Sequence, residues 1–145
     1  MAFLGAAMLA PLFSAAQSVP SRAALCSACH GPNGNSQLKD VPSLAGQPKI
    51  FIENQLVLIR EGMRDIAQMK GMLDNVPDSE LTALAVYYAS LPVAKPTAKR
   101  QAALFTRGET LSQEMRCGIC HLPTYVGREQ MPRLAWQRED YLLYT

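Results

Sequence analysis

The sequence predicts an all-α protein that consists of two tandem copies of one domain. Apolar residues recur at helical spacing, no stretch alternates as a β-strand does, and one five-residue pattern occurs twice along the chain. The 145 residues are 48% hydrophobic and 18% charged, with a net charge of +2. This composition is typical of a soluble globular protein, and it argues against a disordered tail, a multi-span membrane protein or a nucleic-acid binder.

Residues 1–16 have the character of an export signal. They are uncharged, apolar and rich in alanine, and they end in Ser14-Ala15-Ala16, which suits signal peptidase. The first basic residue is Arg22, so the usual basic start of a leader is missing. A start site inside a longer leader or a retained N-terminal anchor would explain this, although sixteen residues fall short of the roughly 20 that span a bilayer. We therefore expect a signal peptide, or an anchor, at residues 1–16.

All four cysteines and both histidines lie in two C-x-x-C-H motifs. These are Cys26-Ser27-Ala28-Cys29-His30 and Cys117-Gly118-Ile119-Cys120-His121. The pattern is the signature of covalent haem attachment, in which each thiol adds to a vinyl group and the histidine binds the iron. A zinc site would require the two cysteine pairs to converge, and redox or structural disulfides would leave the histidines unexplained. The sequence therefore predicts two haem c groups, attached at Cys26, Cys29, Cys117 and Cys120.

The two motifs belong to a longer internal repeat. Cys26 and Cys117 are offset by 91 residues, and the pairs that follow them by 90: Pro42 and Pro132, Leu44 and Leu134, Gln47 and Gln137. Residues 92–100 between the copies contain two prolines and three basic residues, which favours an extended linker. We expect a first domain at 17–91 and a second, partial domain at 101–145.

The first copy contains a short helix into the motif and two longer helices. Residues 48–62 place Ile52, Leu56 and Ile59 on one face, with Ile50, Phe51, Val57 and Leu58 widening it. The second long helix follows Pro77, which suits a helix start, and Pro92 ends it. Its apolar face comprises Leu81, Leu84, Ala85 and Tyr88.

Several segments together resemble the class I c-type cytochromes, and the duplication is similar to the bacterial di-haem cytochrome c4 family. They are CSACHGPNG at 26–34, VPSLAGQ at 41–47, MKGMLDNVPDSELTALAVYYASLP at 69–92, CGICH at 117–121 and MPRLAWQREDYLL at 131–143. The resemblance covers the chain from about Arg22 onward. It implies a periplasmic, and in some cases membrane-associated, electron carrier that is not an enzyme.

The resemblance also implies roles for individual residues. His30 and His121 match the proximal iron ligands, and Met69 matches the distal methionine, with Met63 and Met72 as rivals. Pro42 and Pro132 match the position whose backbone carbonyl accepts a hydrogen bond from the proximal histidine.

The second copy lacks the counterpart of the segment that carries Met69. At the spacing of the first copy, that methionine would fall near position 160, whereas the sequence stops at Thr145. One explanation is a fragment of a longer di-haem cytochrome whose second domain lacks its C-terminal helices. The other is a second haem whose sixth position is open or is filled by water, by Met131 or by a partner. Trp136 also stands where the first copy has Gly46, which puts close backbone packing there in doubt.

The leading functional hypothesis is a respiratory electron carrier that passes single electrons between protein partners. The resemblance implies a terminal oxidase, a quinol-oxidising complex or a dehydrogenase as partner, with possible peripheral membrane association. The alternatives are a cytochrome subunit of a dehydrogenase complex, or a ligand-binding or peroxidase-like protein if the second haem is five-coordinate.

Overall fold

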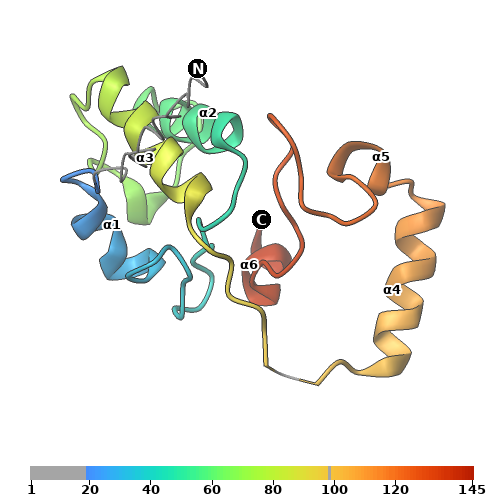
Figure 1. Ribbon diagram of the computed structural model, residues 1–145. Coiled ribbons are helices and arrows are strands. Elements are labelled where there is room, and N and C mark those ends of the chain that lie inside the picture. Colours follow the sequence, from blue (N-terminus) through green and yellow to red (C-terminus); the bar gives the residue numbers. More distant parts are fainter. Residues whose placement is uncertain (1–18, 98) are drawn as a thin grey trace, which may run out of the picture.

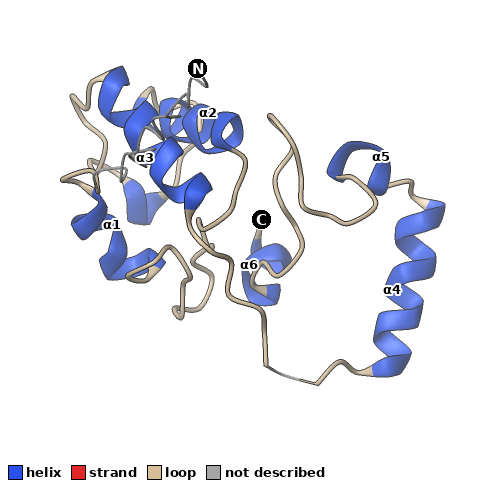
Figure 2. Ribbon diagram, viewed as in Figure 1, coloured by secondary structure: helices blue, strands red, loops and turns tan. Residues whose placement is uncertain are grey.

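The computed structural model describes residues 19–97 and 99–145. Within these residues helices are the only extended regular structure, beside one isolated bridge between Arg128 and Met131 (Figure 2). The predicted all-α class is therefore confirmed. The predicted signal peptide or anchor at 1–16 lies outside the described residues. None of the helices in the described part of the chain has the length and apolar character needed to cross a membrane.

Four helical segments form the first half of the molecule, and three form the second (Figure 1). The first half contains α1 (Ala23–His30), α2 (Lys49–Arg60), the short 3-10 helix η1 (Ala67–Met69) and α3 (Asp78–Ser90). The second half contains α4 (Ala102–Glu114), α5 (Gly118–His121) and α6 (Glu139–Tyr144).

The main core lies where α2 and α3 pack against α1. The predicted face of α3 is confirmed, because Leu81, Leu84, Ala85 and Tyr88 are all buried. Three of them join Ala23 of α1 and Ile52 of α2 in one cluster: Leu84, Ala85 and Tyr88. On α2 the predicted face is narrower than expected, since Ile50 is 41% exposed. This core holds the first motif against two helices from later in the chain.

Local sequence explains both ends of α3. Pro77 precedes it in an extended conformation, and Asp78 and Glu80 lie in its first turn, where carboxylates interact favourably with the helix dipole. Leu91 is extended, as a residue before proline prefers to be, and Pro92 cannot continue the helix. These signals set where the helix begins and ends.

The second half has little core of its own. Among residues 101–145, all of which the structure describes, Arg133 alone is buried. The helix α4 stands apart from α1, α2 and α3, whereas α6, also in the second half, lies nearer to them (Figure 1). Hydrogen bonds from residues 133–141 to the first half hold this part of the chain in place.

The repeat keeps its backbone shape at the position where glycine is replaced. Gly46 and Trp136 both adopt left-handed backbone angles, with φ of 63° and 55°. A side chain at Gly46 would clash with Val93, whereas the Trp136 ring is exposed and lies under the ammonium of Lys95. The doubt about packing at Trp136 is thus resolved: its ring points to the surface, and a stacked linker lysine covers it.

Candidate functional site

The first motif occupies the last two turns of α1. Cys29 and His30 lie three and four residues after Cys26, a spacing that places the three side chains on one side of a helix. Both cysteines are free thiols; Cys29 is exposed, and Cys26 packs against the main core. Burial raises the pKa of the Cys26 thiol. The two thiols and the imidazole lie on one side of α1. This arrangement suits a planar group that is attached through both sulfurs and bound by the imidazole.

The structure brings His30 and Pro42 together. His30 is buried, and its Nδ1 lies 2.9 Å from the carbonyl oxygen of Pro42. A carbonyl only accepts hydrogen bonds, so Nδ1 carries the proton and Nε2 is left with a lone pair. Burial lowers the pKa of His30, although the bond to Pro42 opposes that shift. The ring is therefore neutral near pH 7, oriented, and able to bind a metal through Nε2.

The second motif repeats this arrangement. Cys117 precedes α5, Cys120 and His121 lie within it, and both thiols are free. His121 Nδ1 lies 2.9 Å from the carbonyl oxygen of Pro132, the same distance as in the first motif. The two motifs are thus equivalent in their hydrogen bonding even though the halves around them differ.

The three candidate methionines have different surroundings. Met69 ends η1 and packs against a second apolar cluster of Leu73, Val76 and Leu81. Met63 is 67% exposed, and the backbone carbonyl of Met72 accepts a hydrogen bond from Arg22. Met69 is thus the candidate whose side chain lies against an apolar wall.

Arg133 is a site residue that the sequence analysis missed. It is 2% exposed and donates to the carbonyl oxygens of Ala45 and Ala135, but its buried Nε has no hydrogen-bond partner. Burial lowers the pKa of its guanidinium, and no carboxylate in the described residues pairs with it. A buried cation with an orphaned donor fits a bound group that bears carboxylates, as haem does with its propionates. The one feature of the sequence that could have indicated a role for Arg133 is its position directly after Pro132.

The zinc alternative has no support in the described part of the chain, where no three Cys, His, Asp or Glu side chains gather as a metal site. The thiols, the oriented imidazoles and Arg133 together fit a covalently attached haem.

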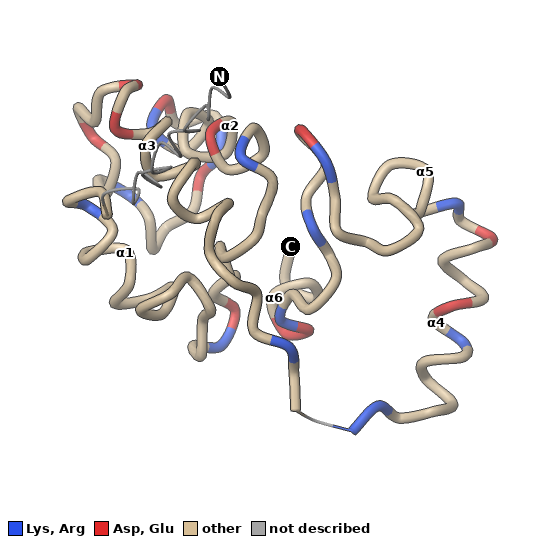
Figure 3. The backbone as a smooth tube through the Cα atoms, viewed as in Figure 1, with Lys and Arg blue, Asp and Glu red and all other residues tan. Residues whose placement is uncertain are grey.

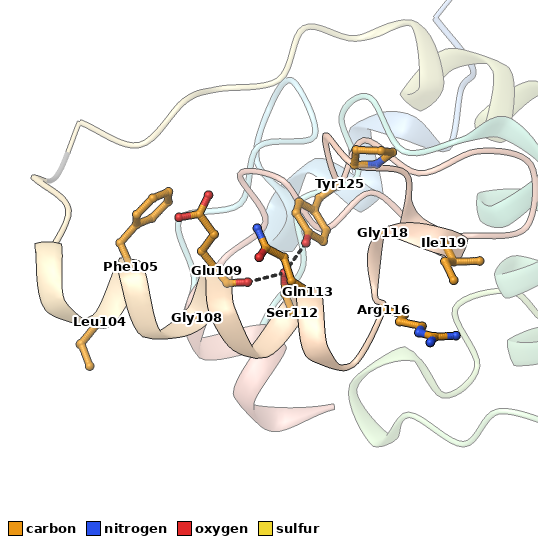
Figure 4. Close-up of a pocket in the computed structure, with 11 residues that line it drawn as sticks. Leu104, Phe105, Gly108, Glu109, Ser112, Gln113, Arg116, Gly118, Ile119 and Tyr125 are labelled. Atoms are coloured by element: carbon orange, nitrogen blue, oxygen red, sulfur yellow. Dashed lines mark hydrogen bonds between the residues drawn. The ribbon is translucent and has the colours of Figure 1, made fainter.

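The second motif adjoins an open hollow. It has a volume of about 870 Å³ and lies between α4 and the α5 region, with Leu104, Phe105 and Ile119 among its apolar walls (Figure 4). On its floor Ser112 and Tyr125 share a hydrogen bond. Because α3 covers α1 in the first half, the second motif is the more open of the two.

An ion pair supports the contact between the halves. Arg138 binds Asp140 at 2.7 Å, and an oxygen of Asp140 accepts the backbone N–H of Asp40 at 3.3 Å. Elsewhere, Lys and Arg are interspersed with Asp and Glu along the chain (Figure 3). The Arg138 guanidinium lowers the pKa of Asp140 below its ordinary value.

We expect acid to weaken this contact at a pH below that at which an ordinary aspartate is protonated. A carboxylate whose pKa is lowered by folding stabilises the fold above its unfolded pKa, about 3.9, and stops doing so as the pH falls through the lowered value. The side-chain carboxyl resonance of Asp140, followed by NMR against pH, should titrate with a midpoint below about 3.9. In the Arg138→Gln variant the midpoint should move up; equal midpoints in the two proteins would contradict the role of Arg138.

Comparison with known proteins adds independent evidence. Residues 21–87 match the family model described as cytochrome C oxidase, cbb3-type, subunit III. Cytochrome c4 of Pseudomonas aeruginosa is 34% identical over 146 residues, which cover 96% of this chain and 73% of that protein. The thiosulfate dehydrogenase electron acceptor of Thiomonas intermedia is 35% identical, covering 96% of this chain and 70% of that protein.

Solved structures show the same relationship. The reduced recombinant cytochrome c4 from Pseudomonas stutzeri superposes with a TM-score of 0.77 at 32% identity, over 84% of this chain and 73% of that one. A thiosulfate dehydrogenase from Marichromatium purpuratum superposes with a TM-score of 0.65 at 27% identity, over 82% of this chain and 28% of that one.

Proposed function

Since this chain belongs to the cytochrome c4 family of di-haem class I c-type cytochromes, which are electron-transfer proteins and not enzymes, we propose that it binds two haem c groups, one at each motif. A haem supplies an iron that alternates between the ferrous and ferric states. The residues of the chain attach the haem, bind its iron and orient the ligands.

The observation that carries the proposal is the repeated hydrogen bond to the proximal histidine. His30 and His121 each approach a proline carbonyl at 2.9 Å, through residues that are equivalent in the repeat. This bond fixes the ring and makes the imidazole a stronger donor to iron. Finding it at both motifs supports two haems rather than one.

Each residue then has a defined task. Cys26, Cys29, Cys117 and Cys120 form the thioether links, and His30 and His121 bind iron from the proximal side. Met69 is the sixth ligand at the first motif, where a thioether favours the reduced state. Arg133 neutralises a propionate carboxylate at the contact between the halves.

We place the protein outside the cytoplasm, in the periplasm, with residues 1–16 as its export signal. Residues 17–91 and 101–145 form the two haem domains, and residues 92–100 join them. Its partners are redox proteins of a respiratory chain: a quinol-oxidising complex or a dehydrogenase as donor and a terminal oxidase as acceptor, with peripheral attachment to the membrane. The Thiomonas relative, a thiosulfate dehydrogenase electron acceptor, fits a dehydrogenase as donor.

The test is to express the chain in a bacterium that has its haem-attachment machinery, and in the same strain without it. We expect an intact mass that includes two haems, and reversible one-electron reduction of each, only in the first strain. Colourless protein of unmodified mass from both strains would overturn the proposal. Rapid carbon monoxide binding by half of the haem, and by none of it in the Cys117→Ala/Cys120→Ala variant, would indicate an open sixth position at the second motif.

A further inference from the structure

The two halves meet through a pair of reciprocal glutamine contacts. Gln47 Oε1 accepts the backbone N–H of Arg133 at 2.8 Å, and its Nε2 donates to the carbonyl of Arg133 at 3.0 Å. Gln137 does the same with Ser43, at 2.8 Å and 2.9 Å. Gln47 and Gln137 are equivalent in the repeat, as are Ser43 and Arg133. The contact is therefore symmetric in the sense of a two-fold interface, although it lies within one chain.

The peptide group that Gln137 binds is the one that orients His30. The N–H of Ser43 and the carbonyl of Pro42 belong to a single planar peptide unit. Its carbonyl accepts the His30 Nδ1 proton at 2.9 Å while its N–H donates to Gln137 at 2.8 Å. An unbroken series of hydrogen bonds thus runs from a proximal histidine in the first half to a glutamine in the second.

The opposite series is built in the same way. The carbonyl of Pro132 accepts from His121 at 2.9 Å, and the N–H of the following residue, Arg133, donates to Gln47 at 2.8 Å. Each half thus supplies the glutamine that binds the other half's proline peptide.

The surroundings strengthen these bonds. His30, Ser43, Gln47 and Arg133 are all buried, with exposures between 2% and 8%. Water therefore screens the series poorly, and hydrogen bonds that share a peptide group polarise one another by about 10–30% per bond. An acceptor on the N–H makes the carbonyl of the same peptide a better acceptor. The carbonyl then draws more strongly on the Nδ1 proton, and the imidazole becomes a stronger donor to iron.

We infer that Gln137 tunes the iron-binding strength of His30, and Gln47 that of His121, so that docking of the two halves sets the electron affinity of both haems. Both glutamines are positioning residues, since neither contacts the iron. The inference rests on the proposed function, because it requires the two histidines to be iron ligands. Its distinctive feature is that each glutamine acts on the haem of the opposite half.

The experiment is to compare Gln137→Met and Gln47→Met in the haem-loaded protein. Methionine is close to glutamine in size but offers no strong acceptor, so the histidine becomes a weaker donor and the ferric state loses stability. At a fixed ambient potential, the ratio of reduced to oxidised haem should rise about two- to tenfold at the first motif in Gln137→Met and at the second in Gln47→Met. Haem methyl resonances in partly oxidised samples assign each potential to its motif.

A second readout follows the bond itself. In the reduced protein, the Nδ1 proton of His30 should move upfield in Gln137→Met, while that of His121 stays in place. Tyr141→Phe is the control, because it removes another hydrogen bond between the halves, to Arg64, without touching either proline peptide. It should leave both protons and both potentials unchanged.

Three results would overturn the inference: no shift, an equal shift at both haems, or a shift in the glutamine's own half. Should Gln137→Met fail to fold, Gln137→Glu keeps an acceptor for Ser43, and the His30 Nδ1 proton should then move downfield; an unmoved proton would contradict the inference. Protein without attached haem would instead overturn the proposed function, so the two failures are distinguishable.

Discussion

Replacing Met69 by alanine is expected to abolish the sulfur-to-iron absorption band of the first haem and to lower its potential. Met69 is the last residue of η1, and its side chain lies against the cluster of Leu73, Val76 and Leu81. Loss of the thioether removes the ligand that favours the reduced state. Among the described residues, no other methionine or cysteine packs against that cluster. Absorption spectra of the oxidised protein and a redox titration measure both effects.

Met72→Ala and Met63→Ala are the matched controls for this prediction. Met63 is largely exposed, so its loss should leave the band and the potential unchanged. A band that survives in Met69→Ala and disappears in Met72→Ala would assign the ligand to Met72.

The second large effect concerns the two cysteine pairs. Replacing Cys117 and Cys120 together by alanine should remove one haem from the intact mass and leave the first half folded, because the main core contains no residue of the second half. Replacing Cys26 and Cys29 should also remove one haem. The Cys26 and Cys29 double variant should lose far more stability than the Cys117 and Cys120 double variant, because Cys26 packs against the main core, to which α1 also contributes Ala23.

Intact mass and hydrogen exchange of α2 and α3 distinguish the two double variants. Ser27→Ala is the control within the first motif, because it leaves both thiols and should retain both haems. Equal loss of protection in α2 and α3 in the two cysteine variants would contradict the prediction, because it would show that the first half depends on the second motif as much as on its own.

The helices of the first half were predictable because their signals are local. Pro77, the acidic residues after it and Pro92 mark the limits of α3, and the spacing of its apolar residues identifies its buried face. On α2 the same reasoning overestimated the buried face at Ile50, because amphipathic spacing shows which side faces inward but not how far the neighbouring helix reaches.

The site was predictable only where its chemistry is encoded by adjacent residues. The C-x-x-C-H motifs name the thiols and the imidazoles directly. Arg133 and the two glutamines were not identified as site residues, because a glutamine after a proline loop has no local feature that shows what its amide will meet. Their partners lie 86 and 94 residues away in sequence.

By itself, the sequence determined that this protein is helical, that it contains an internal repeat, and that each copy carries one C-x-x-C-H motif. Those properties depend on covalent spacing and on periodicity, which are read along the chain. The tertiary structure alone decided that each proline peptide is bound by the opposite half and that Arg133 is buried without a carboxylate partner among the described residues. Such contacts form when distant segments pack together and exclude water, and no local pattern specifies them.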